Sequence, residues 1–185
     1  MTNIQPAIFI VPIIALILVI VLYISLSKKS AHKEAFKRFI LTLAVVAFLL
    51  NYVWELAHMP LYKDASFSAQ HIAFCGLASV ADALMVLLLY LGVAFFYKKP
   101  FWVQGADFQQ IIRVMTIGGI GAIIGELAHT SAGDWSYADS MPMIPFVHVG
   151  LTPILQFLIL PTLTYFLSLY FLKKTSKKEV LFISI

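Results

Sequence analysis

The chain has 185 residues, of which 61% are hydrophobic and 12% charged, and its mean hydropathy is +0.92. Because a soluble domain carries about 25% charged residues, this composition excludes a soluble protein and indicates an integral membrane protein. The only cysteine, Cys75, excludes an internal disulfide and a thiolate metal cluster.

Five apolar stretches are long enough to cross a hydrocarbon core, which takes about 20 residues as a helix. They cover residues 8–26, 39–59, 71–96, 111–130 and 145–172. The first is expected to be a retained span and not a signal peptide, because its basic residues follow the apolar run. We therefore predict a single all-α integral membrane domain over residues 1–185, built as a five-transmembrane-helix bundle.

Basic residues lie on one side of this predicted bundle. The loops and the tail on that side contain Lys28, Lys29, Lys33, Lys37, Arg38, Lys98, Lys99, Arg113, Lys173, Lys174, Lys177 and Lys178, and only Lys63 lies on the other side. Basic loops stay in the cytoplasm, so we predict a multi-pass protein of the cell membrane with its N-terminus outside and its C-terminus inside. This topology accounts for the net charge of +4 without a nucleic-acid partner.

The tetrapeptide Glu-Leu-Ala-His occurs twice, from Glu55 to His58 and from Glu126 to His129. Each copy is one helical turn, which places its carboxylate and its imidazole on one helix face. Both copies are expected near the outer end of helices that run outward, so they should lie at the same depth. The spacing of Gly121 and Gly125 before the second copy predicts close approach of another helix.

Three predicted spans contribute further polar stripes. The second span carries Asn51 and Trp54 before Glu55; the third carries His71, Cys75, Ser79 and Asp82; the fifth carries His148, Thr152 and Gln156. Polar groups in hydrocarbon are costly and often mark function, although a single one can simply hydrogen-bond a neighbouring helix. Three acids, Glu55, Asp82 and Glu126, exceed what helix packing requires. We predict that the stripes converge on one site.

The segment from residue 131 to 142 mixes turn formers with aromatic residues and contains Asp134, Trp135 and Tyr137. Trp and Tyr favour the membrane interface, so this segment is either an interfacial anchor or a lid over a site that opens to lipid.

A carboxylic acid kept protonated by apolar surroundings can protonate an alkene or an epoxide, and aromatic faces can stabilise the resulting cation. Such chemistry predicts a lipophilic isoprenoid-type substrate that enters from the bilayer, with no cofactor. The predicted catalytic acids are Glu55, Glu126, Asp134 and Asp82. The predicted substrate-binding residues are Asn51, Trp54, His58, His71, His129, Trp135, Tyr137, His148 and Gln156.

The pair Trp54-Glu55, followed much later by the turn Gly133-Asp134-Trp135-Ser136-Tyr137, resembles the small polytopic cyclases of isoprenoid metabolism. These include membrane-type lycopene cyclases, carotenoid hydratases and fungal meroterpenoid cyclases. The stretch from Trp135 to Leu163 is similar to the same group. The resemblance implies that Glu55 is one proton donor and that Asp134 or Glu126 is the other. The chain departs from these families in its shortness, its five spans and its histidines.

The histidines leave two other functions open. Glu-x-x-His on two helices is typical of di-iron sites in four-helix bundles, which would make Glu55, His58, Glu126 and His129 iron ligands in a lipid oxidase or desaturase. A haem held by histidines is a further possibility. A separate, non-enzymatic alternative is a lipid-binding or quinone-binding membrane subunit, or a small transporter component.

Overall fold

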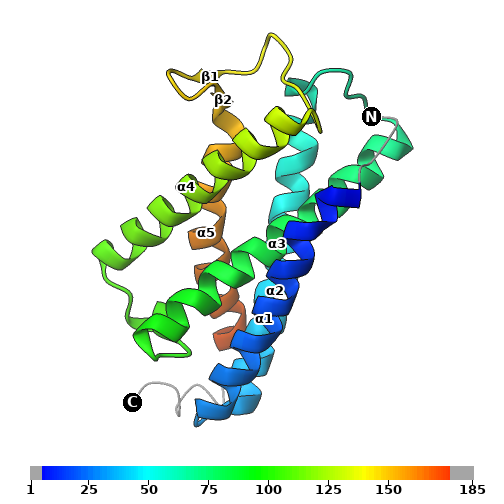
Figure 1. The fold of residues 1–185 in the computed structure, drawn as a ribbon. Helices are drawn as coiled ribbons and strands as arrows, with labels where there is room; N and C mark the ends of the chain where they lie inside the picture. Colours follow the sequence, from blue (N-terminus) through cyan, green and yellow to red (C-terminus); the bar gives the residue numbers. More distant parts are fainter. Residues whose placement is uncertain (1–5, 176–185) are drawn as a thin grey trace.

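The computed structural model describes residues 6–175 and consists of five long helices (Figure 1). These are α1 (Ile10–Lys29), α2 (Lys33–His58), α3 (Ala69–Tyr97), α4 (Phe108–Ala132) and α5 (Leu151–Thr175). Short 3₁₀ turns lie at Pro6–Phe9, Met59–Leu61 and Trp102–Gly105, and strands β1 (Met143–Ile144) and β2 (Val149–Gly150) form an antiparallel hairpin. All five helices are long and apolar enough to cross a membrane, which confirms the prediction of an all-α, multi-pass membrane protein.

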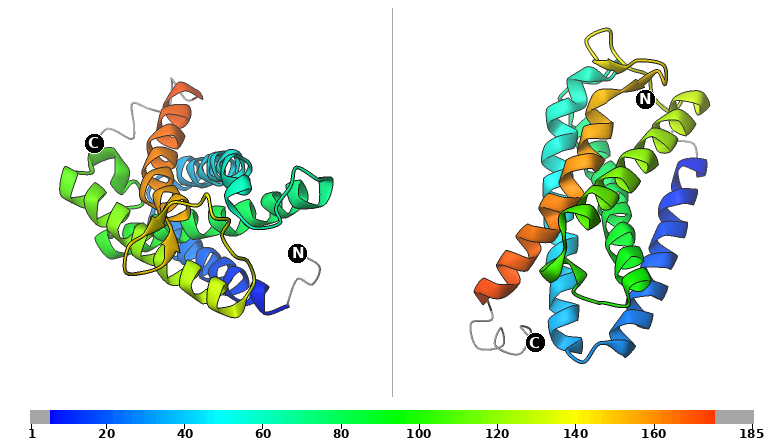
Figure 2. Two further views of the ribbon diagram at one scale, coloured as in Figure 1. Left: turned by 90° about the horizontal axis from the view of Figure 1, so that it is seen from above. Right: turned by 90° about the vertical axis from the view of Figure 1, so that its left-hand side faces the viewer.

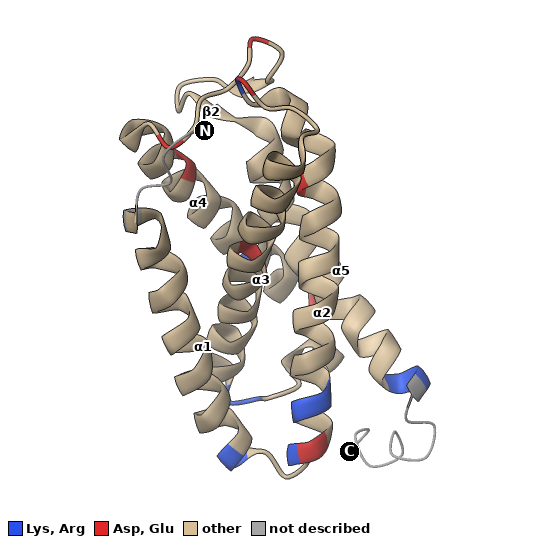
Figure 3. Ribbon diagram, turned by 90° about the vertical axis from the view of Figure 1, so that its right-hand side faces the viewer, with Lys and Arg blue, Asp and Glu red and all other residues tan. Residues whose placement is uncertain are grey.

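The helices run alternately up and down the molecule, so the connections gather at two ends (Figures 1 and 2). We call the end with residues 59–68 and 133–150 the hairpin end, and the end with residues 30–32 and 98–107 the basic end. Figure 3 shows Lys and Arg gathered at the basic end, whereas several Asp and Glu residues lie within the bundle or at the hairpin end. Lys177 and Lys178, predicted to share the basic side, lie outside the described residues.

The tightest packing lies in the basic half of the bundle. Helix α2 packs on α3 and α5, while α1 packs on α3 and α4 packs on α5. Tyr90 is fully buried, and its ring centroid lies 5.1 Å from those of Phe39 and Tyr165. The indole N–H of Trp102 donates to the Tyr90 carbonyl oxygen at 3.2 Å, which ties the loop between α3 and α4 to this core. Aromatic burial of this kind is a large source of folding free energy.

Two glycines allow α4 to approach α5 closely, but they are not the pair expected from the sequence. A Cβ at Gly118 would overlap the carbonyl oxygen of Phe157, and a Cβ at Gly119 would lie 2.8 Å from a methyl carbon of Leu158. A Cβ at Gly121 or Gly125 would meet no heavy atom within 4 Å. The expectation that Gly121 and Gly125 form the helix contact is therefore wrong, because the close contact with α5 lies at Gly118 and Gly119, about one and two turns earlier on α4.

The fifth helix begins at Leu151 and not at Pro145 as predicted. Residues 143–150 form the β-hairpin instead, and its connection contains Phe146 and His148 with positive φ angles of 73° and 54°. Pro145 lacks a backbone N–H and disfavours helix at the preceding residue, whereas a hydropathy window registers only that this segment is apolar. His148 consequently lies on the exposed hairpin and not on the helix that carries Gln156.

Candidate active site

A cavity of about 600 Å³ lies inside the bundle between the aromatic core and the hairpin end. Its wall comes from all five helices and from the loop that carries Trp135, and most of the wall is apolar. Ile13 on α1 and Ile117 on α4 line the cavity and yet remain 55% and 54% exposed on the bundle surface. The cavity thus reaches the surface that these spanning helices present to surrounding lipid.

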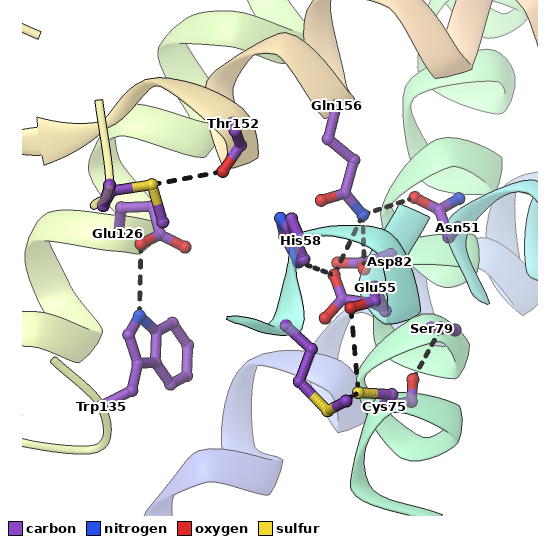
Figure 4. Close-up of polar contacts among 12 residues, drawn as sticks. Asn51, Glu55, His58, Cys75, Ser79, Asp82, Glu126, Trp135, Thr152 and Gln156 are labelled. Carbon is purple, nitrogen blue, oxygen red and sulfur yellow. Dashed lines mark hydrogen bonds and ion pairs between the residues drawn. The ribbon is translucent and has the colours of Figure 1, made fainter. Parts of the chain in front are cut away.

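One polar cluster on the wall is centred on the buried Gln156 side chain of α5 (Figure 4). Its Nε2 atom lies 2.8 Å from Asn51 Oδ1, 3.0 Å from Asp82 Oδ2 and 3.2 Å from Glu55 Oε1. The Asn51 Nδ2 group donates to the Ala47 carbonyl oxygen at 2.8 Å, which directs Oδ1 towards Gln156. We call Asn51, Glu55, Asp82 and Gln156 the amide–acid cluster.

The amide–acid cluster has more acceptors than amide protons. An amide NH₂ group has two hydrogens, whereas three oxygens surround the Gln156 nitrogen. A proton on the Glu55 or Asp82 carboxyl group would supply the missing donor. The cluster is therefore suited to hold and release a proton within the membrane.

His58 lies one helical turn after Glu55 and is only 5% exposed. Its Nε2 atom is 3.2 Å from Glu55 Oε1, but the contact is not aligned as a hydrogen bond, and neither ring nitrogen has a hydrogen-bond partner among the described residues. The ring also makes an edge contact with Tyr62, at a centroid distance of 5.2 Å.

A second polar cluster surrounds Glu126 near the end of α4. The Trp135 indole N–H donates to Glu126 Oε2 at 3.2 Å, and the Tyr137 hydroxyl donates to the same oxygen. The Trp135 ring stacks on His129 at 4.4 Å, and His129 Nδ1 lies 2.7 Å from Asp134 Oδ2. We call these five residues the glutamate–aromatic cluster.

Gly133 positions this cluster by ending α4. Its φ angle of 77° suits a residue without a side chain, and the Asp134 N–H bonds back to the His129 carbonyl oxygen at 3.0 Å. The chain then turns back so that Asp134, Trp135 and Tyr137 contact the last two turns of the helix. In the sequence Trp135 is next to Asp134. This proximity gave no indication that the Trp135 indole would hydrogen-bond to Glu126 instead.

Tyr62 connects the two clusters and was missed from the sequence. Its ring lies 5.2 Å from His58, 6.4 Å from Trp135 and 5.6 Å from Tyr137. Backbone hydrogen bonds on either side, from Lys63 N–H to the Ser136 carbonyl and from Ala138 N–H to the Leu61 carbonyl, are both 2.9 Å long. They hold the 59–68 loop against the 133–150 loop. The available signal was an aromatic residue close in sequence to His58, at the expected membrane edge where Tyr is common.

The two loop tyrosines remain neutral near neutral pH. Burial raises the pKa of the Tyr62 hydroxyl, and the nearby Glu126 and Glu55 carboxyl groups raise it further. Burial and the hydrogen bond to Glu126 likewise raise the pKa of Tyr137 above its ordinary value. Tyr137 is thus a hydrogen-bond donor to Glu126 and not a competing anion.

The structure brings most of the predicted site residues to one cavity. The wall includes Glu55, His58, His71, Asp82, Glu126, His129, Trp135 and Gln156. Asn51, Asp134 and Tyr137 lie behind this wall and contact its residues. Trp54 and His148 are not part of the wall, so the predicted pairing of Glu55 with the Trp54 ring is not formed there. Neighbouring residues on a helix point about 100° apart, which separates Trp54 from Glu55.

The predicted iron ligands do not converge. Within residues 6–175, no group of three or more His, Cys, Asp or Glu side chains is arranged to hold a metal ion. Glu55 and His58 face Gln156 and Tyr62, whereas Glu126 accepts hydrogen bonds from aromatic donors and His129 pairs with Asp134. This arrangement does not fit a carboxylate-bridged di-iron site, which needs ligands from both Glu-x-x-His turns around one metal pair.

Comparisons of the chain with protein-family models, with curated proteins and with solved structures found no match. The resemblance to isoprenoid cyclases stays a prediction, carried by short motifs. The cavity and its two polar clusters are therefore the features that bear on function.

Proposed function

We propose that this chain is an integral membrane enzyme that protonates an alkene or an epoxide of an isoprenoid-type lipid, leading to cyclisation, isomerisation or hydration. The observation that carries the proposal is the chemical make-up of one cavity: three acids, Glu55, Asp82 and Glu126, lie on a mostly apolar wall together with aromatic rings, three histidines and Gln156. Ionisable residues inside a spanning bundle are costly and usually functional.

Glu126 is the best candidate for the proton donor. Both of its hydrogen-bond donors, Trp135 and Tyr137, contact the same oxygen, Oε2. The proton can therefore reside on Oε1. Transfer from Oε1 leaves a carboxylate whose negative charge is already met by two fixed donors, which stabilises the charge as it develops.

The remaining steps can be assigned to the aromatic rings beside Glu126 and to the amide–acid cluster. Protonation of one alkene carbon leaves a cation on its neighbour, which the Tyr62 and Trp135 rings can stabilise through their faces. A ring closure or double-bond shift ends when the cation loses a proton, and the amide–acid cluster offers Glu55 and Asp82 as acceptors. Each cycle then returns one proton to Glu126, so protons balance. Hydration would end instead when water adds to the cation and the resulting oxonium ion loses a proton to Glu55 or Asp82.

The charge distribution supports the predicted orientation. Lys and Arg gather at the basic end (Figure 3), and basic segments remain on the cytoplasmic side. We therefore propose that the N-terminus faces outward and that the cavity lies in the outer half of the membrane.

Deuterium labelling tests the proposed chemistry. Membranes containing the protein are incubated in D₂O with farnesol, geranylgeraniol, squalene, squalene epoxide or lycopene, and products are analysed by mass spectrometry. The proposal expects the wild type to form a product from at least one of these lipids. A product that arises by alkene protonation will contain a new carbon–deuterium bond. Glu126→Gln, which keeps shape but removes the acid, should lower the yield at least about 100-fold.

A matched control uses Glu34, an acid at the basic end of α2. Glu34→Gln should retain wild-type product yield. Absence of product from all five lipids, or an unchanged yield in Glu126→Gln, would refute the proposed function. Incorporation of oxygen from ¹⁸O₂ into the product would instead indicate an oxygenase, and an O₂-dependent new double bond without such incorporation would indicate a desaturase.

A further inference from the structure

Acid–base chemistry at the three carboxyl groups gives His58 no role, although His58 is the most buried histidine on the cavity wall. It differs from the other two wall histidines in its hydrogen bonding. His71 Nδ1 lies 3.0 Å from Ser66 Oγ, and His129 Nδ1 lies 2.7 Å from Asp134 Oδ2. His58 Nε2 lies 3.2 Å from Glu55 Oε1, but neither ring nitrogen makes an aligned hydrogen bond among the described residues, and Nδ1 has no polar contact of this kind. Buried polar groups almost always have one, because leaving them unpaired is unfavourable.

The surroundings of His58 restrict what could pair with it. The ring lies beside the Glu55 carboxyl group (Figure 4) and makes an edge contact with the Tyr62 ring, at the cavity wall. Among residues 6–175, the same wall contains three acids and no Lys or Arg side chain. A phosphate or carboxylate headgroup would meet negative charge without compensation, so anionic ligands do not fit. A neutral imidazole has one N–H donor and one acceptor nitrogen, which match a neutral oxygen group.

Room for an attached hydrocarbon chain lies along α4. Gly125 and Gly121 both line the cavity and have open space where a Cβ would be. From Glu126 to Gly118 the helix rises about 12 Å, so the open face runs from the glutamate–aromatic cluster towards the middle of the bundle. The chain can follow this face while its polar end remains near His58.

We infer that the cavity binds a lipid with a neutral oxygen-bearing end group, such as a hydroxyl, and that His58 hydrogen-bonds to this oxygen. The inference rests on the proposed function for the lipid character of the substrate and adds the polar group that positions it. His58 is then a positioning residue: it fixes one end of the lipid so that an alkene further along the chain lies beside Glu126.

Matched probes test this inference without turnover. Binding to the full-length protein in nanodiscs is measured by native mass spectrometry for geranylgeraniol, for the hydrocarbon in which hydrogen replaces its hydroxyl, and for geranylgeranyl diphosphate. The alcohol should bind about tenfold more tightly than the hydrocarbon, the effect expected of one buried hydrogen bond. The diphosphate should bind no better than the hydrocarbon.

Variants assign the preference to one side chain. His58→Phe keeps an aromatic ring but removes both nitrogens, and it should bind alcohol and hydrocarbon about equally. The control is His32→Phe, which alters a histidine at the basic end that does not line the cavity. Equal binding of alcohol and hydrocarbon to the wild type, or an unchanged preference in His58→Phe, would overturn the inference.

A second measurement needs no variant and so does not depend on how well His58→Phe folds. In ¹⁵N-histidine-labelled wild-type protein, geranylgeraniol should shift an imidazole resonance that the hydrocarbon leaves unchanged. No such difference would also count against the inference. Selective alcohol binding without any catalytic product would leave the inference intact and refute the proposed function. Product formation together with equal binding of alcohol and hydrocarbon would refute the inference and leave the proposed function intact.

Discussion

Glu126 shows how one side chain can be prepared for proton transfer by its neighbours. Trp135 and Tyr137 both donate to Oε2, and the neighbouring wall is apolar. Fixed donors stabilise a developing charge without the reorganisation that water would need. The two carboxyl oxygens therefore differ: Oε2 accepts both hydrogen bonds, and in the proposed mechanism Oε1 carries the proton.

The Tyr137 contact predicts a pH dependence of stability. The folded protein raises the pKa of Tyr137 above its ordinary value of 10.0, so the folded state retains this proton when an unfolded chain would lose it. The contribution is complete below pH 10 and is lost as pH rises through the folded value. Thermal unfolding midpoints of the wild type should thus fall above pH 10, and less steeply in Tyr137→Phe.

The control for that measurement is Tyr97→Phe at the basic end, where the Tyr97 hydroxyl accepts a hydrogen bond from Arg113, whereas the Tyr137 hydroxyl donates one to Glu126. Its decline above pH 10 should match that of the wild type. Identical slopes for Tyr137→Phe and the wild type would show that the tyrosine does not keep its proton on folding.

Sequence spacing predicted part of the site at this scale. Helical periodicity places Asn51 and Glu55 on one face, and the position of Gln156 in a span brings it to the same level, so the convergence of the amide–acid cluster was expected. Tyr62 was missed because it follows the helix, where periodicity no longer applies. His148 was wrongly assigned to a helical stripe because the prolines that precede it redirect the backbone into a hairpin.

At the scale of elements, the glycines of α4 serve two purposes. Gly118 and Gly119 contact α5, with Gly118 also at the cavity wall, whereas Gly121 and Gly125 border the cavity and have open space where a Cβ would be. A sequence motif gives the spacing of small residues but not the direction in which the partner helix lies. The first pair holds the bundle together, and the second leaves space within it.

This difference predicts opposite effects of the same substitution. Gly118→Ala would place a methyl group against the Phe157 backbone carbonyl, which can yield only if α5 moves, and should destabilise by about 1–3 kcal/mol. Gly121→Ala meets open space and should stabilise by roughly 0.5–1 kcal/mol, since alanine is the better helix former. Unfolding of both variants in detergent checks the pair. Equal changes in the free energy of unfolding would contradict the close contact at Gly118 and the open space at Gly121.

At the scale of the whole molecule, packing and function divide between two halves. The basic half contains the buried aromatic core, and the other half contains the cavity and both polar clusters. Hydropathy and length were sufficient to predict five spans, because each helix alone must satisfy its backbone in lipid. The cavity depends on how the helices separate towards the hairpin end, which no single span encodes.

This division gives a final prediction about orientation. In a Cys75→Ala background, Asp139→Cys places a thiol on the exposed hairpin-end loop, and Lys98→Cys places one at the basic end. A membrane-impermeant maleimide should label Asp139→Cys in intact cells and Lys98→Cys only after permeabilisation, because basic loops stay in the cytoplasm. The reverse pattern would put the cavity in the inner half, so that a lipid would have to enter from the cytoplasmic leaflet. The Glu126 chemistry would survive that result, but the proposed side of entry would not.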